Sequence, residues 1–427
     1  MENTISDIKI SESISNKFAW FTIHYYILAM VVNFAYLYWN NIRVGIICAI
    51  IMILVFVDFI FKKSRYIKII DSKTTLLVIA FIFYNLIMIY IGVLNGYPAL
   101  IGISEFSNGV LPIIFYFVAL NMSNFEEFKF VKSFTYACLF LVLIGIIMYI
   151  TKPDIYFDYM QRSIIHYHQE TYLASPRMHS FVGSVVVGSV ACMAFALEIN
   201  FLISKRKYYR AILSSVILLI GIILTMQRSS WLFAVIAIML ISLSILSDKT
   251  KSFRPIIKFG FIIFMLSVIA ALIIPNLIEI ILNRISLINV DAITERSADW
   301  GYVLEQGIAT LFGGGLGTGG HRAMFIRDIT IRDNNYFKMI YEIGLIGNIM
   351  LIGIMISTIL KGIFNYRKYA VYVCIVLGIL FQSIGSNTLS FQLVTPMFWF
   401  AVGRINCKVL NNVNEPDMID LLPHEYY

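Results

Sequence analysis

Charged residues are scarce in this sequence: Asp, Glu, Lys and Arg make up 14% of its 427 residues, whereas hydrophobic residues make up 59%. Soluble domains contain about 25% charged residues. A soluble chain this apolar could not cover its surface with polar groups. The apolar residues also lie in blocks close to the length of about 20 residues that crosses a bilayer. The composition therefore excludes an ordinary soluble domain and predicts an integral membrane protein.

Metal-binding and nucleotide-binding patterns are also missing. The five cysteines are scattered in or beside apolar blocks, without the spacing of a metal site or a disulfide framework. No HExxH motif and no DxD-like acidic pair occurs. We therefore expect no metal and no cofactor. The net charge is +8, but the basic residues lie in short loops between apolar blocks, which is the topology signal of membrane proteins. A nucleic-acid partner is not expected.

Twelve apolar blocks predict an all-α polytopic membrane protein with one long folded extracytoplasmic loop. The expected spans are Phe18–Trp39, Ile42–Phe61, Thr74–Leu94, Asn108–Leu120, Ser133–Ile150, Ser180–Ile203, Tyr209–Met226, Ser230–Leu246, Phe259–Pro275, Phe337–Leu360, Tyr369–Ser386 and Phe391–Ile405. Pro112 interrupts the fourth span, and residues 102–109 are expected to form a broken or re-entrant stretch.

Loops rich in lysine and arginine alternate with the other loops, which predicts that the basic loops and both termini are cytoplasmic. Two outward segments, residues 151–179 and 276–336, are long, and such loops are usually functional or disordered. The longer one has a mixed apolar and polar character that predicts a folded loop. The expected organisation is nine helices with the outer loop 151–179 in residues 1–275, the large extracytoplasmic loop 276–336, three helices in 337–405 and a cytoplasmic tail 406–427.

The outward segments favour arginine: by this topology they hold nine arginines and two lysines. An arginine fork binds phosphate at two points and keeps its charge when desolvated. Arg228 lies in a minimal turn between two spans, Arg177 precedes a span, and Arg296 lies in the long loop. These arginines suit an anionic substrate such as a lipid pyrophosphate. Anchoring to lipid headgroups and flanking of a helix are the alternatives.

Two further motifs lie in or beside the long loop. The glycine cluster at residues 313–320 allows either close approach of the backbone to a ligand or a flexible turn. Asp333 lies just before a span, where it could act as a general base on a sugar hydroxyl or cap the following helix. The outward histidines have no ligand spacing, which favours a surface role over a metal site; they are His166, His168, His179 and His321.

Taken in chain order, four segments resemble the O-antigen polymerase and ligase superfamily, over roughly residues 175 to 350. No single motif is specific, but the ordered set on this frame is fairly specific. The segments are Ser175-Pro176-Arg177 through Gly183, the Gln-Arg-Ser-Ser-Trp turn around Arg228, Arg296 with Trp300 and Gly315-x-Gly317, and Asp333-Asn334-Asn335-Tyr336 with Glu342-x-Gly344-Leu345-x-Gly347.

The resemblance implies a metal-independent transferase at the outer face of the bacterial cytoplasmic membrane. A polymerase of this kind moves a growing glycan from undecaprenyl pyrophosphate onto the next lipid-linked repeat unit. By position, the family's pyrophosphate-binding arginines correspond to Arg177, Arg228 and Arg296. Asp333 and Arg296 are the expected catalytic residues. The substrate-binding loop is expected to include Gly315, Gly317, His321 and Tyr336.

The ligase of the same superfamily, which transfers the glycan to a lipid A core, is the alternative enzyme. Its last motif commonly begins with His, whereas this chain has Asp333, which favours the polymerase. A flippase is a less favoured alternative, because only Asp58 and a few edge carboxylates are expected to approach span interiors. Membrane lipids, a chain-length regulator and a flippase are the expected partners. The sugar, the linkage, the chain length and the oligomeric state stay open, as does the choice between O-antigen, capsule and exopolysaccharide.

Overall fold

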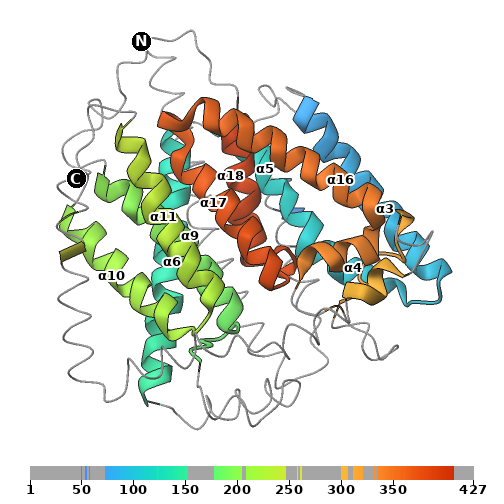
Figure 1. Ribbon diagram of the computed structural model, residues 1–427, viewed down its shortest axis with the longest axis horizontal. Coiled ribbons are helices and arrows are strands. Elements are labelled where there is room, and N and C mark those ends of the chain that lie inside the picture. Colours follow the sequence, from blue (N-terminus) through green and yellow to red (C-terminus); the bar gives the residue numbers. More distant parts are fainter. Residues whose placement is uncertain are drawn as a thin grey trace.

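The computed structural model describes residues 73–122, 124–151, 177–203, 208–246, 300–305, 311–320, 331 and 334–407, together with isolated residues between 50 and 57 and between 257 and 261. Every regular element in these ranges is a helix (Figure 1). In chain order they are α3 (Lys73–Leu94), α4 (Ala99–Glu105), η1 (Phe106–Val110), η2 (Leu111–Ile113), α5 (Ile114–Asn121), α6 (Asn124–Thr151), α9 (Ser184–Ile203), α10 (Tyr208–Leu224), α11 (Arg228–Leu246), α16 (Asn335–Phe364), α17 (Tyr366–Gly385), η4 (Thr388–Ser390) and α18 (Thr395–Asn406).

Six helices in the described ranges are long and apolar enough to cross a membrane, and α10 and α11 are shorter apolar helices. The six are Lys73–Leu94, Ala99–Asn121, Glu126–Thr151, Ser184–Ile203, Asn335–Phe364 and Tyr366–Gly385. They confirm the prediction of an all-α membrane protein. The expected spans Phe18–Trp39, Ile42–Phe61 and Phe259–Pro275 lie outside the described residues. So do most of the loops 151–179 and 276–336 and the tail after residue 407.

The span around Pro112 is broken in its middle, as its sequence predicts. The chain passes from α4 through a five-residue π-helix, η1, and a three-residue 3-10 helix, η2, before α5 resumes the regular geometry. Proline lacks a backbone N–H and cannot continue the ladder of the preceding turn. The span starts at Ala99 rather than at the predicted Asn108, and it continues through the break instead of turning back.

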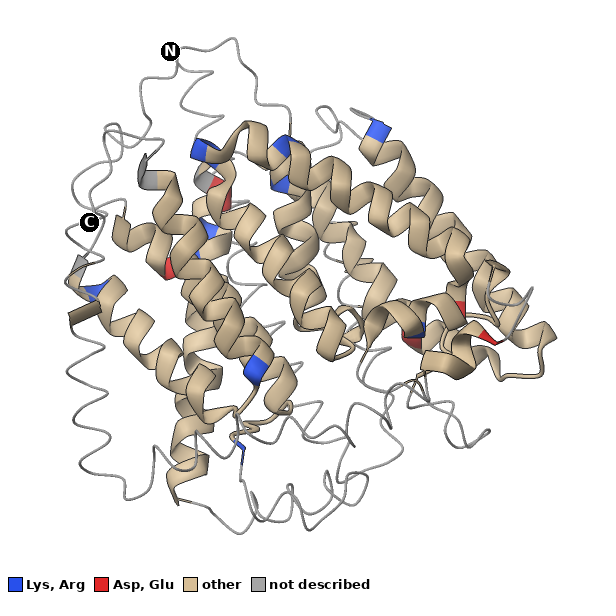
Figure 2. Ribbon diagram, viewed as in Figure 1, with Lys and Arg blue, Asp and Glu red and all other residues tan. Residues whose placement is uncertain are grey.

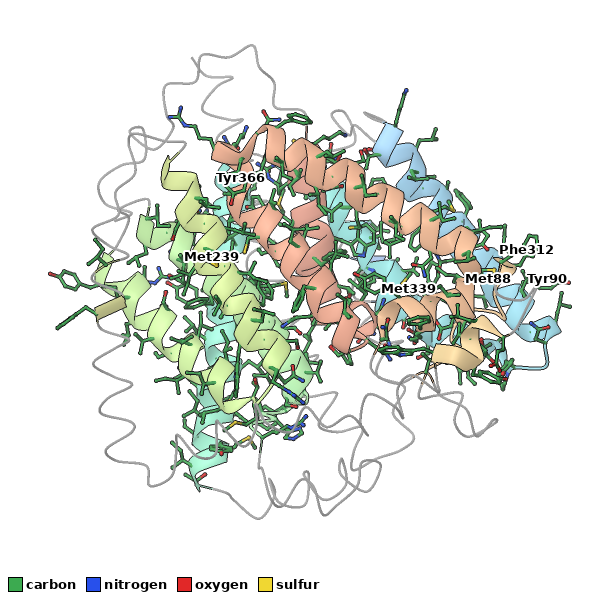
Figure 3. The ribbon with its side chains drawn as sticks, in the orientation of Figure 1. Met88, Tyr90, Met239, Phe312, Met339 and Tyr366 are labelled. Atoms are coloured by element: carbon green, nitrogen blue, oxygen red, sulfur yellow. The ribbon has the colours of Figure 1, made fainter. Side chains whose placement is uncertain are left out.

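Helix α9 is the centre of one half of the bundle, packed by α6, α10, α11 and α17 (Figure 1). Small side chains let these neighbours approach closely. A Cβ at Gly188 would lie 2.5 Å from Ser230 Oγ of α11. Large apolar side chains cover the outside of the bundle: Tyr90 is 64% exposed and Phe312 is 54% exposed, at its edge in Figure 3. Such a surface fits lipid hydrocarbon rather than water.

Helix α16 is kinked at Gly344, whose φ of 67° and ψ of 179° are not helical. The carbonyl oxygens before the kink bond to other segments. The carbonyl of Tyr341 accepts from the N–H of Gly314 at 2.7 Å, and that of Glu342 accepts from the N–H of Gly315 at 2.9 Å. The carbonyl of Ile343 accepts from the Tyr84 hydroxyl of α3 at 2.9 Å. The glycine segment 311–320 therefore completes the hydrogen bonding of a broken helix.

The close approach of these glycines is to the protein's own backbone. Gly315 has a φ of +113°, and a Cβ there would lie 2.2 Å from Gly92 Cα of α3. At Gly317 the added atom would lie 2.9 Å from the Ile101 carbonyl oxygen of α4. The segment is thus packed between α3, α4 and α16, which disfavours the interpretation as a flexible turn. A substrate contact of Gly315 and Gly317 stays a prediction.

Gly315→Ala should strongly destabilise the protein, because both the positive φ and the contact with Gly92 exclude a side chain. Overpacking and backbone strain together should cost at least about 2 kcal/mol. The measurement is the amount of folded protein in the membrane and its thermal unfolding midpoint in detergent. Gly301→Ala is the matched control, since a Cβ at Gly301 meets nothing within 4 Å. Equal stability of the two variants would contradict the packing role.

A buried arginine joins the end of α18 to the end of α5 and the start of α6. Arg404, near the end of α18, donates to the carbonyl oxygens of Ala119 at 3.2 Å and Met122 at 2.9 Å, and it pairs with Glu127 of α6. These bonds satisfy carbonyls that the end of α5 leaves without helical partners. Figure 2 shows how few charged residues the helices carry elsewhere.

Candidate functional site

The segments of Arg177 and Arg228 meet at one end of the bundle. The N–H of Met178 donates to the carbonyl of Leu224 at 2.9 Å, which joins the loop before α9 to the turn between α10 and α11. Both segments contain a non-glycine residue with positive φ: Ser180 at 48° and Met226 at 52°. Such strained residues persist only where the surrounding structure holds them, and they cluster at functional sites.

Arg228 is the first residue of α11, and it is half-buried. The carbonyl of Gln227 accepts from the N–H groups of Ser230 and Trp231, both at 3.1 Å, so the first turn of the helix is well formed. The amino end of a helix carries a partial positive charge and points N–H groups outward. A guanidinium at that position adds a full charge. This turn is therefore suited to an anion such as a phosphate group.

Helix α17 connects this turn with the start of α16. Gln382 Nε2 donates to Ser230 Oγ at 3.0 Å, and the Tyr336 hydroxyl donates to the carbonyl of Leu380 at 2.8 Å. Two of the segments named by the family resemblance, the Arg228 turn and the stretch that includes Tyr336, thus border the same end of α17. Sequence could not show this, because α17 itself carries no such motif.

Asn334, not Asp333, caps α16. Asn334 Oδ1 accepts from the N–H of Tyr336 at 3.0 Å and from the N–H of Phe337 at 3.2 Å. The alternative interpretation of Asp333 as the helix cap is therefore wrong, because the helix begins one residue later than that interpretation requires. Asp333 itself lies outside the described residues, and its role as a base stays a prediction.

Arg296 and His321 also lie outside the described residues, so their predicted roles stay predictions. The structure describes the neighbouring segment 300–305. The Trp300 ring stacks on Phe337 of α16, with centroids 5.3 Å apart and an interplanar angle of 5°. This stacking contact brings the segment that follows Arg296 to the amino-terminal turn of α16.

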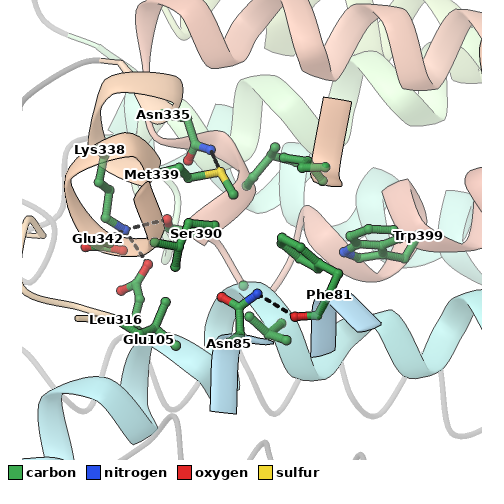
Figure 4. A pocket seen from close by; sticks show the side chains of 15 residues that line it. Phe81, Asn85, Glu105, Leu316, Asn335, Lys338, Met339, Glu342, Ser390 and Trp399 are labelled. Atoms are coloured by element: carbon green, nitrogen blue, oxygen red, sulfur yellow. Dashed lines mark hydrogen bonds and ion pairs between the residues drawn. The ribbon is translucent and has the colours of Figure 1, made fainter. Parts of the chain in front are cut away.

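A buried ionic cluster under the glycine segment was missed from sequence (Figure 4). Lys338 Nζ pairs with Glu105 of α4, donates to Ser390 Oγ at 2.7 Å and lies 3.7 Å from Glu342 Oε1. The N–H of Gly319 donates to Glu342 Oε1 at 3.2 Å. The expectation that only Asp58 and edge carboxylates approach span interiors is therefore wrong. The spacing of Asn335, Lys338 and Glu342, on one helical face, was the available signal.

A cavity of about 40 Å³ lies beside this cluster, which is space for a few water molecules. Polar and charged groups line one part of it: Asn85, Glu105, Asn335, Lys338, Glu342 and Ser390. Apolar side chains such as Phe81, Leu316 and Trp399 line the rest. Charged groups at such depth are costly and are functional candidates by default.

His179 follows Met178 in the Arg177 segment, and its Nε2 atom is buried, against the expectation of a surface histidine. Burial lowers the pKa of His179 from 6.5 to about 4, because desolvation disfavours the imidazolium. A lowered pKa in the folded state means that the stability contribution is complete above pH 6.5 and is lost as the pH falls toward 4.

Acidification from about pH 7 to pH 5 should therefore lower the stability of the wild type by about 2 kcal/mol. In His179→Gln this part of the pH dependence of stability should be absent. The measurement is the thermal unfolding midpoint of both proteins at the two pH values. An identical acid shift in the variant would show that His179 does not titrate in this range.

The fold and the site define a class: a multi-pass, all-α membrane protein with buried charges and a basic helix terminus at one end of the bundle. No protein-family model and no curated protein matches the chain.

Proposed function

We propose that the chain polymerises oligosaccharide repeat units linked to undecaprenyl pyrophosphate. The observation that supports this best is the junction of the Arg177 and Arg228 segments at the amino end of α11, held by the bond from Met178 to Leu224. Two half-buried arginines and a helix terminus in one place suit a pyrophosphate at the membrane surface. The ordered motifs that resemble the polymerase and ligase superfamily add the reaction type.

In the proposed reaction the terminal hydroxyl of the acceptor unit attacks the anomeric carbon of the donor glycan. The new glycosidic C–O bond forms as the bond from that carbon to the pyrophosphate oxygen breaks. Arg177, Arg228 and Arg296 neutralise the charge that develops on the departing pyrophosphate. Asp333 takes the proton of the attacking hydroxyl. Attack opposite the leaving group inverts the configuration at the anomeric carbon.

The proposal includes the twelve-span topology in a bacterial cytoplasmic membrane, with both termini inside and the loop 276–336 facing the periplasm or exterior. It needs no metal or cofactor, and lipid-linked glycans are the substrates. A chain-length regulator and a flippase of the same pathway are proposed partners. The alternation of basic loops in the sequence supports this orientation.

The direct test is chain extension by the purified protein with lipid-linked repeat units, in excess EDTA. A ladder of extended products is expected. Single unextended units under all conditions would reject the polymerase, and activity that returns only with Mg²⁺ or Mn²⁺ would reject the metal-independent mechanism. In cells, deletion should leave single repeats on the surface glycan, whereas loss of a ligase would leave intact chains unattached.

The buried ionic cluster favours a second candidate, a transporter. Charged groups between two interrupted helices are typical of transporters, in which broken helices form the substrate and ion sites. Here Glu105 ends α4 at the break, and Glu342 lies two residues before the kink at Gly344. Movement of a lipid-linked unit across vesicle membranes, without extension, would favour the transporter over the polymerase.

A further inference from the structure

Glu342 is a buried carboxylate whose charge is only partly compensated. Its side chain is 3% exposed, and it accepts from the backbone N–H groups of Gly317 and Gly319, the latter at 3.2 Å. The nearest ammonium, Lys338 Nζ, lies 3.7 Å away and is already bonded to Glu105 and Ser390. A buried carboxylate that shares its counter-charge with another carboxylate requires further positive charge.

Asn335 gives an independent sign of a ligand in the same place. It is 1% exposed and lines the same cavity as Glu342 (Figure 4). Its Nδ2 contacts the Met339 sulfur at 3.1 Å, while its Oδ1 accepts no hydrogen bond from the described residues. A buried amide oxygen without a donor is costly, so it indicates a water, a proton donor or a cation in the cavity.

We propose that this cavity binds one monovalent cation, a proton or Na⁺, with Glu342 as its principal ligand. The polar groups available in the cavity are mainly hard oxygens, from the carboxylates, the Asn335 amide and the Ser390 hydroxyl. Alkali cations prefer such hard oxygen donors over nitrogen or sulfur, and a proton would bind a carboxylate oxygen of Glu342. The volume of about 40 Å³ admits a cation with a few waters but no sugar ring.

The bound cation would connect two broken helices. Glu105 ends α4 where the π-helix η1 begins, and Glu342 precedes the kink of α16. The other ionisable groups of the described segments around Glu342 are Lys338 on α16, Glu105 on α4 and Tyr84 on α3, whereas residues 311–320 contribute none. π-Helical turns are frequent at functional sites, and broken helices form the coupling-ion sites of transporters.

Thermal unfolding of the full-length protein tests the proposal, first in NaCl against choline chloride at equal ionic strength and then across pH 6 to 9. If Na⁺ is the ligand, the wild-type midpoint rises with NaCl. If the ligand is a proton, NaCl has no specific effect and the wild type loses stability relative to Glu342→Gln as the pH rises. Either dependence should be lost in Glu342→Gln, because the variant carries no charge to compensate.

Lys338→Gln is the matched variant with the opposite expectation. It removes the ammonium nearest to Glu342, so its midpoint should depend more steeply on Na⁺ or pH than that of the wild type. If Glu342→Gln fails to fold, Glu105→Gln replaces it: Lys338 is then released to Glu342, and the dependence should disappear. A wild type indifferent to both Na⁺ and pH, or a dependence unchanged in Glu342→Gln, would overturn the proposal. The readout is stability, so the result is independent of whether the protein extends glycans.

Discussion

Arg228→Lys should lose most of its chain-extending activity, by about 100-fold to 1,000-fold, at equal abundance in the membrane. The substitution keeps the charge at the start of α11 but replaces a planar fork by a point charge. An ammonium cannot make the two-point contact with a pyrophosphate, and the loss of one charge-stabilising donor typically costs this much in rate. The measurement is the initial rate of extension of lipid-linked units by purified protein.

Arg210→Lys is the matched control. Arg210 lies near the start of α10, whereas the Arg228 turn follows the end of that helix. The Arg210 guanidinium stacks over the Tyr136 ring at 4.4 Å. An ammonium can replace it there, because lysine also makes cation–π contacts. Activity close to that of the wild type is expected. If Arg228→Lys were as active as Arg210→Lys, Arg228 would be an anchor to lipid headgroups and the proposed pyrophosphate site would be wrong.

Asp333→Asn and Asn334→Ala should separate catalysis from helix capping. Because Asn334 holds the N–H groups of Tyr336 and Phe337, its replacement by Ala should cost about 1 kcal/mol of stability while leaving the chemistry intact. Asp333→Asn should leave stability nearly unchanged, since the cap is elsewhere. An amide cannot take a proton near neutral pH, so turnover should fall at least about 100-fold.

The two measurements are turnover at saturating substrate and the thermal unfolding midpoint. A stable Asp333→Asn variant with turnover within about tenfold of the wild type would remove Asp333 from the mechanism, since general bases contribute more than this. The base would then have to be sought at Glu295, the residue before Arg296, or at His321, or the reaction would use no protein base at all. An inactive Asn334→Ala variant of normal stability would show that Asn334 does more than cap the helix.

The helices were the predictable part of this protein. The sequence places spans at Thr74–Leu94 and Ser180–Ile203, and the structure has α3 at Lys73–Leu94 and α9 at Ser184–Ile203. In lipid every backbone polar group must be satisfied within the protein, and a helix satisfies nearly all of its own, so a long apolar block has few structures open to it. The break near Pro112 was predictable for a related reason, because proline removes a donor from the helix.

The partners of the polar residues were not predictable. Lys338 and Glu105 are 233 residues apart in the chain, and nothing in either segment names the other. The glycine segment shows the same limit, because its composition predicts close approach but not that Gly92 and Gly344 are what it approaches. Nor could the sequence show which residue caps α16, because Asp333 and Asn334 are both good cap residues.

The sequence by itself therefore determined that the chain is a helical membrane protein, since apolar length and the cost of unpaired backbone groups in lipid act locally along the chain. Only the tertiary structure decided which polar groups share a site. It joined the Arg177 and Arg228 segments through one backbone bond and buried Glu342 beside Lys338. These contacts depend on how helices distant in sequence pack, because a buried charge takes whichever partner the packing brings within reach.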